Sequence, residues 1–195
     1  MSALVSNPWN SLEVVKICVA LLTPILIFGV GLYINKSLIL IEHNQWRNQK
    51  LIEKRIDVYD DLMPDLNDLL CYFAHMGNWK KFTPEYIVGL KRAIDRKVHL
   101  AAPLFADDFF AACTEFIGLC YETYTGGVND AKLRISPDDW KTAFGDEWKL
   151  EWNVHFSEKS KFTNTEKIRD AYSLIVKIFA REMGLNPKTS YSVKK

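Results

Sequence analysis

The chain has almost no excess of charge of either sign. Its 195 residues include 25 Lys and Arg against 24 Asp and Glu, which gives a formal net charge of +1 at pH 7. A chain balanced in this way carries no overall field that would attract nucleic acid or an acidic substrate. Nucleic acid is therefore not directly indicated as a partner.

Paired cysteines and metal-ligand spacings are also missing. The cysteines form no Cys-x-x-Cys motif and no Cys and His pattern at ligand spacing. Three of them lie among apolar residues, as buried free thiols do in a reducing compartment. We therefore expect neither a metal nor a cofactor. The four cysteines are Cys18, Cys71, Cys113 and Cys120.

Catalytic and phosphate-binding motifs are absent as well. The scattered histidines have no Ser, Cys or Asp partner at motif spacing. Residues 125–132, TGGVNDAK, contain two adjacent glycines but lack the Gly-Lys-Ser/Thr ending of a phosphate loop, so a turn is the simpler interpretation. We predict that the protein is not an enzyme.

One long apolar run lies near the N-terminus. Residues 17–34, ICVALLTPILIFGVGLYI, contain no charged side chain. At about 1.5 Å of rise per residue this run gives a helix of roughly 27 Å, close to the hydrocarbon thickness of a bilayer. No small-residue cleavage site follows it, which argues against a removable signal peptide. We predict a transmembrane helix at 13–36, with a buried helix of a soluble domain as the alternative.

The charges beside this run predict its orientation. Residues 1–13 contain no Lys or Arg, whereas several basic residues follow the run closely. Basic residues accumulate on the cytoplasmic side of a span. We therefore expect a single-pass protein of the inner membrane, with the N-terminus outside and the C-terminal region in the cytoplasm. The basic residues are Lys36, Arg47, Lys50, Lys54 and Arg55.

A few residues of the span carry possible functional roles. Proline can kink a spanning helix, and glycine allows a second helix to approach closely. Polar residues near the two ends could line a pore in an oligomer, although extension of their side chains toward the headgroups is the simpler interpretation. These residues are Lys16, Pro24, Gly29, Gly31, Asn35 and Lys36.

The remainder predicts an all-α fold in which the membrane helix continues into a cytoplasmic helical bundle. We divide the chain into an N-terminal tail (1–12), the transmembrane helix (13–36), a juxtamembrane stalk (37–55), a helical domain (56–185) and a disordered tail (186–195). Helical spacing predicts further helices over 83–100, 106–123 and 164–183, and Thr83 is expected to cap the first of them.

Residues 129–156 fit two different periods. Alternation of apolar and polar residues at 131–135 and 148–156 predicts strands. Aromatic residues also recur every four positions, which predicts a helix. We favour a helix over 137–156, broken near Gly145, because β-branched residues are scarce there. A small β-hairpin within 131–156 is the alternative. The aromatic residues are Trp140, Phe144, Trp148, Trp152 and Phe156.

Three clusters are candidates for binding. The first is an acidic helix face at Asp57, Asp61, Asp65 and Asp68, for which a solvated surface is favoured over a metal or catalytic site. The second is a basic cluster that could bind an anion or an anionic lipid, at Lys91, Arg92, Arg96 and Lys97. The third could be a partner-binding face or part of the core, at Trp140, Trp148 and Trp152.

The span at residues 17–34 ahead of a compact helical domain resembles the small single-span bacterial membrane effectors of anti-phage defence systems. The resemblance implies a homo-oligomer that perturbs the bilayer of the inner membrane when a regulatory cytosolic protein or complex releases it. Two alternatives stay open. One is a membrane-tethered adaptor or scaffold that binds a cytosolic protein, and the other is a sensor or enzyme that binds a nucleotide or a lipid.

Overall fold

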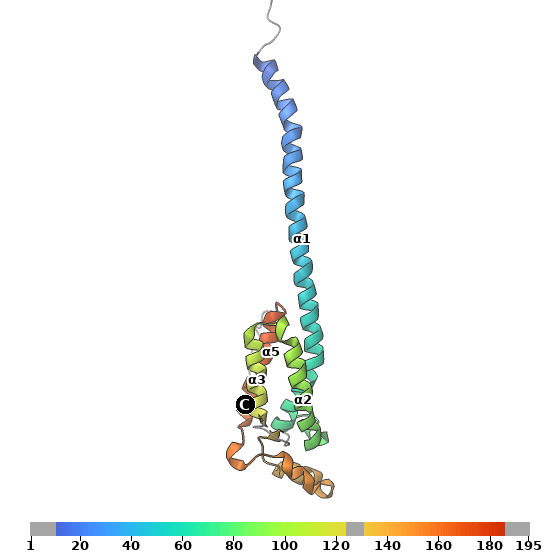
Figure 1. The fold of residues 1–195 in the computed structure, drawn as a ribbon, viewed down its shortest axis with the longest axis vertical. Coiled ribbons are helices and arrows are strands. Elements are labelled where there is room, and N and C mark those ends of the chain that lie inside the picture. The colour runs from blue at the N-terminus through green and yellow to red at the C-terminus, as the bar shows by residue number, and fades with distance from the viewer. Residues whose placement is uncertain (1–10, 124–130, 186–195) are drawn as a thin grey trace, which may run out of the picture. The chain divides into compact units, whose positions relative to one another are not determined.

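The computed structural model describes residues 11–123 and 131–185, apart from the side chains of residues 11–14, 37, 39–41, 43 and 44. Most of the described chain is helical, as predicted (Figure 1). Residues 1–10 of the expected N-terminal tail, the expected turn at 125–130 and the expected tail at 186–195 lie outside the described residues. The chain forms two compact units, residues 1–50 and residues 51–195, called here the N-terminal unit and the C-terminal unit.

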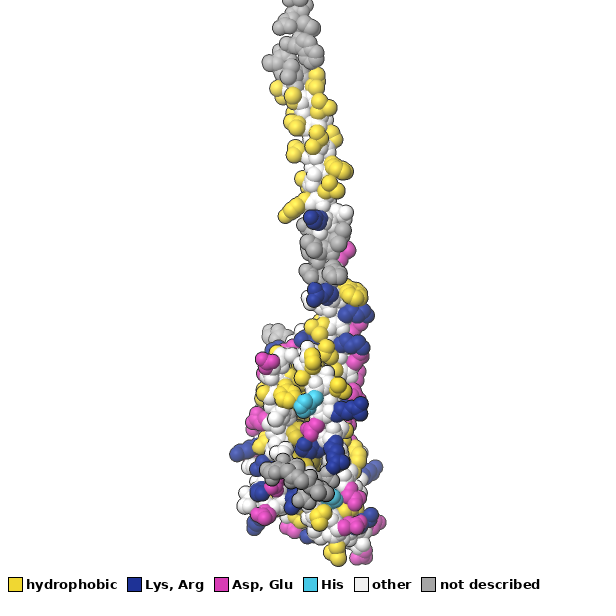
Figure 2. All heavy atoms as spheres, in the orientation of Figure 1, with side chains coloured by type: hydrophobic (Ala, Val, Ile, Leu, Met, Phe, Trp, Pro, Cys, Tyr) yellow, Lys and Arg dark blue, Asp and Glu magenta, His cyan; other side chains and the backbone are white. Residues whose placement is uncertain are grey.

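The first helix, α1, runs from Ser11 to Ala74. No loop therefore separates the segment expected in the membrane from the expected stalk. Within the described residues, one helical segment is long and apolar enough to cross a membrane, the 22 residues Val15–Lys36. Its large apolar side chains are exposed in the isolated chain (Figure 2). Such exposure is typical of a helix that is solvated by lipid.

The C-terminal unit combines the last part of α1 with four shorter helices. They are α2 (Pro84–Ala101), α3 (Asp107–Cys120), α4 (Asp138–Phe144) and α5 (Thr165–Glu182). Short 3₁₀ turns join or follow them at Trp79–Lys81, Ala102–Leu104, Gly145–Glu147, Leu150–His155 and Lys159–Lys161.

Two helices begin at side-chain caps, of which the cap at Thr83 is the one predicted from the sequence. The Thr83 hydroxyl oxygen accepts a hydrogen bond from the Tyr86 backbone N–H at 3.2 Å. The Asn164 carboxamide oxygen accepts one from the Glu166 backbone N–H at 2.7 Å. Each bond satisfies an N–H group that has no partner within its helix. The local sequence therefore sets where α2 and α5 begin.

The core of the C-terminal unit lies where α1, α2, α3 and α5 face one another (Figure 1). Each of these helices contributes fully buried apolar side chains at helical spacing, and this burial is the main force that holds the helices together. The completely buried side chains include Leu62, Leu66, Leu69, Ile87, Ile94, Phe109, Phe116, Ile168, Ile175 and Phe179.

The helix expected over 106–123 ends earlier than predicted. α3 ends at Cys120, and residues Tyr121–Glu122 form strand β1. β1 pairs in antiparallel register with β2, Lys132–Leu133, so that Tyr121 lies opposite Leu133. This pairing with a later segment of the chain takes the residues after Cys120 out of the helix.

For the helix expected over 137–156, the break near Gly145 is confirmed, but only the first half is α-helical. α4 occupies Asp138–Phe144, and Gly145 has a φ of 53°, which favours glycine and ends the helix. The following residues form 3₁₀ turns. The alternative hairpin is also misplaced, because β2 pairs with β1 and Leu133 makes only an isolated parallel bridge with Phe156.

Candidate functional site

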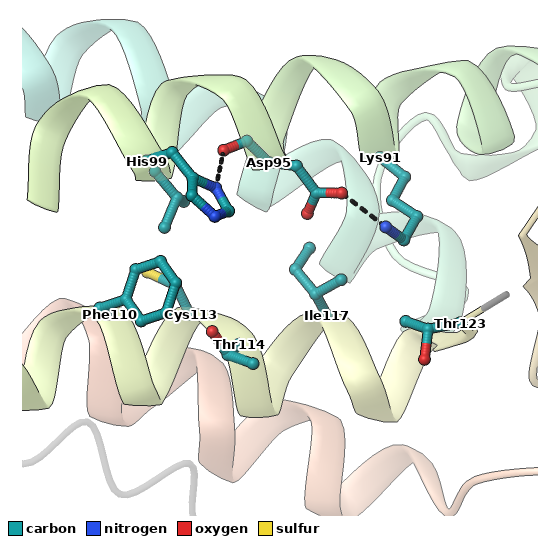
Figure 3. Close-up of a pocket in the computed structure, with 9 residues that line it drawn as sticks. Lys91, Asp95, His99, Phe110, Cys113, Thr114, Ile117 and Thr123 are labelled. Carbon is teal, nitrogen blue, oxygen red and sulfur yellow. Dashed lines mark hydrogen bonds and ion pairs between the residues drawn. The ribbon is translucent and has the colours of Figure 1, made fainter. Parts of the chain in front are cut away.

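A pocket of about 200 Å³ lies between α2 and α3 (Figure 3). Lys91, Asp95 and His99 project into it from α2, where spacings of four place them on one face of the helix. Phe110, Cys113 and Ile117 project toward them from α3. Val98, Thr114 and Thr123 complete its lining.

The α2 side of the pocket is polar and internally paired. The Lys91 ammonium lies 2.5 Å from Oδ2 of Asp95, with the two side chains 17% and 38% exposed. His99 Nδ1 lies 2.8 Å from the Asp95 backbone oxygen. A carbonyl oxygen only accepts, so this His99 nitrogen donates the hydrogen bond. The pocket therefore presents a cation and an anion that already neutralise each other.

The α3 side of the pocket is largely apolar. The Phe110 ring meets the His99 ring edge to face, with centroids 5.1 Å apart. Cys113 is buried, and burial raises the pKa of its thiol to about 12. A thiol that stays protonated at neutral pH is a poor nucleophile. The arrangement suits binding of a small molecule better than covalent catalysis through Cys113.

The basic cluster expected from the sequence does not converge on one site. Lys91 belongs to the pocket, whereas the Lys97 ammonium lies 3.0 Å from Asp61 and 2.9 Å from Asp65 on α1. Arg92 and Arg96 are exposed. At about 100° per residue, Lys91 and Lys97 leave α2 about 120° apart, so they meet different neighbours. Binding of an anion or an anionic lipid by this cluster therefore stays a prediction, with Lys91 and Lys97 each already paired with carboxylates.

Three carboxylates of the acidic face of α1 contact α2, whereas Asp57 is exposed and pairs with Lys54 on α1 itself. Asp61 and Asp65 bind Lys97, and the Tyr86 hydroxyl donates to Asp68 at 3.4 Å. Partial burial raises the pKa of Asp68. Among the described residues, no group of three His, Cys, Asp or Glu side chains is arranged to hold a metal ion.

Two of the three candidate tryptophans lie in the core, which was one of the two interpretations left open by the sequence, and not on an exposed face. Trp140 is completely buried and Trp152 is 4% exposed, whereas Trp148 is half-buried. Trp140 packs on Tyr72 of α1 with ring centroids 4.5 Å apart, and Trp148 meets Trp152 edge to face. Large aromatic surfaces contribute most when they are removed from water, so the core interpretation is the correct one.

The span residues singled out in the sequence all lie on α1. Lys16, Pro24, Gly29, Gly31, Asn35 and Lys36 are exposed in the isolated chain. No heavy atom lies within 4 Å of the position that a Cβ would take at Gly29 or Gly31. Before the proline, the Thr23 hydroxyl donates to the Val19 backbone oxygen at 2.6 Å, so this polar group is satisfied inside the helix.

The sequence alone did not identify the pocket as a site. The spacing of Lys91, Asp95 and His99 was readable as one helix face, but it is also typical of a solvated surface. Phe110 and Ile117 come from another helix, and only the packing of α3 against α2 brings them opposite this face.

Comparison with models of protein families, with curated proteins and with solved structures found no match.

Proposed function

We propose that this protein is a membrane-anchored effector that perturbs the bacterial inner membrane through self-association of its span, as part of anti-phage defence. In this proposal the N-terminus lies outside and the C-terminal unit is a cytoplasmic helical bundle that restrains the span until a cytosolic partner releases it. The observation that carries the proposal is the exposed 22-residue segment Val15–Lys36.

The distribution of side chains around this segment supports self-association. At about 100° per residue, most of its small and polar residues fall within about 120° of the helix circumference. Small residues let two backbones approach closely in a membrane, and polar groups favour a protein or water contact over lipid. The small and polar residues on this side, called here the small-residue face, are Lys16, Ala20, Thr23, Pro24, Gly31 and Asn35, and they share the arc with Ile17, Ile27 and Ile34.

Gly31 and Gly29 offer a matched test of this face. They lie two positions apart, so they point to nearly opposite sides of the helix. Gly31→Leu would thicken the small-residue face, whereas Gly29→Leu makes the same chemical change outside it. We expect full-length protein to arrest growth and depolarise cells, Gly31→Leu to abolish both effects, and Gly29→Leu to retain them.

The measurements are growth, a membrane-potential dye and in-cell cross-linking of the full-length chain. Removal of residues 1–40 should abolish toxicity in the same assay. A full-length protein that is harmless under all conditions, or equal effects of the two leucine substitutions, would contradict the proposal. A harmless protein that still binds a cytosolic partner would favour the tethered adaptor.

A further inference from the structure

The pocket between α2 and α3 has the size of a site for one ring. Its volume is about 200 Å³. An apolar cavity of about 150 Å³ is enough to hold benzene. The pocket thus has room for a six-membered ring with one small substituent. Val98, Phe110 and Ile117 supply apolar contacts for such a ring, and Phe110 also offers an aromatic surface.

The Lys91 and Asp95 side chains, called here the polar rim of the pocket, disfavour a charged ligand. Lys91 and Asp95 pair at 2.5 Å, and the Lys91 side chain is mostly covered. An anion would have to compete with Asp95 for Lys91, and a cation with Lys91 for Asp95. Either exchange would leave one partly buried charge without its partner, which is costly. A neutral ligand binds without breaking the pair.

The same rim is complementary to an amide. Lys91 presents hydrogen-bond donors beside the acceptor oxygens of Asp95. A carboxamide carries the opposite pattern, since its oxygen accepts and its nitrogen donates. We propose that the α2–α3 pocket binds a small neutral ligand made of one planar ring and a carboxamide-type group. The ring lies against Phe110 and Ile117, and the amide meets the Lys91 and Asp95 side chains.

The test uses full-length protein in lipid nanodiscs and three phenyl compounds that differ in charge. We expect benzamide to bind with a dissociation constant on the order of 1 mM, as suits so small a ligand. Benzoate and benzylamine should bind at least tenfold more weakly. Saturation-transfer NMR and calorimetry measure the binding. The proposal would be overturned if benzamide did not bind at about 20 mM, well above the expected dissociation constant. Equal binding of benzamide and the two charged compounds would also overturn it.

Two variants, each with a matched control, test whether benzamide binds in this pocket. Thr114→Phe adds a ring at the exposed edge of the pocket and should weaken benzamide binding at least tenfold, whereas Thr142→Phe, the same change on α4, should not. Lys91→Met with Asp95→Leu removes the polar rim but keeps the apolar walls. This double variant should lose benzamide and prefer toluene, and the same paired change at Lys54 and Asp57 is its control.

Circular dichroism checks the fold of each variant. If Thr114→Phe does not fold, the double variant and the shift of the Ile117 methyl signals in the wild-type protein decide the question. Unchanged benzamide binding in the folded variants, or no shift of those methyl signals, would overturn the proposal. These readouts measure binding directly, so they are independent of whether the span perturbs a membrane.

Discussion

Arg55 shows how much structure one side chain can organise. Its guanidinium donates to the Leu104 backbone oxygen and to the Glu182 backbone oxygen, both at 2.7 Å. It also pairs with the Glu182 carboxylate at 2.8 Å and lies over the Phe105 ring. The two charged side chains are only 16% and 12% exposed. Arg55 thus ties α1 to the end of α5 and to the turn before α3.

We predict that Arg55→Met destabilises the C-terminal unit by about 3 kcal/mol, because the mostly buried Glu182 carboxylate keeps only Arg181 as a partner and two carbonyl groups lose their donor. Adding Glu182→Leu should recover part of this loss, since the mostly buried carboxylate that has lost one of its two arginine partners is then removed. Chemical unfolding of the full-length protein, followed by tryptophan fluorescence, measures both effects.

Lys54→Met is the control for this prediction. Lys54 pairs with Asp57 at 2.8 Å, but both side chains are well exposed, so its loss should cost less than about 1 kcal/mol. The interpretation of Arg55 fails if the two single substitutions destabilise the protein equally.

At the scale of elements, an ion pair as well as packing connects the N-terminus of α3 to the C-terminus of α5. Arg181, in the last turn of α5, binds both oxygens of Asp108 in the first turn of α3, at 2.8 and 3.0 Å. An anion at a helix N-terminus and a cation at a helix C-terminus are each favourable. The hydrogen bonds from Arg181 lower the pKa of the Asp108 carboxyl.

This pair predicts a defined pH dependence. A lowered pKa in the folded state means that the Asp108 carboxylate stabilises the fold above the ordinary Asp pKa of about 3.9. The contribution is lost as pH falls through the lowered value. The stability difference between wild type and Asp108→Asn should therefore be present at pH 6 and decrease as the pH falls below the ordinary Asp pKa and through the lowered one.

The adjacent Asp107→Asn is the control, because Asp107 shares the first turn of α3. Thermal unfolding at a series of pH values measures both variants. A difference for Asp108→Asn that persists unchanged at low pH would show that its carboxylate is not the stabilising group.

At the scale of the whole molecule, the charges beside the span determine the expected topology. Residues 1–13 lack Lys and Arg, and basic residues follow Lys36. Positive charge is retained on the cytoplasmic side. The proposed effector needs this orientation, because its control depends on a cytosolic partner that reaches the C-terminal unit.

Protease added to intact spheroplasts should leave the C-terminal unit uncut, and protease added to inverted membrane vesicles should digest it. Immunoblotting for a C-terminal tag measures both results. Digestion in spheroplasts would show that the C-terminal unit lies outside, which would exclude its control by a cytosolic partner.

The sequence by itself determined the apolar segment Val15–Lys36 and the starts of α2 and α5. Hydropathy and capping depend on neighbours along the chain, so they can be read without a structure. The tertiary structure alone decided the burial of Trp140, the pairing of Lys97 with α1 and the pocket between α2 and α3. These features depend on residues far apart in the sequence, and helical periodicity shows which residues share a face but not what that face meets.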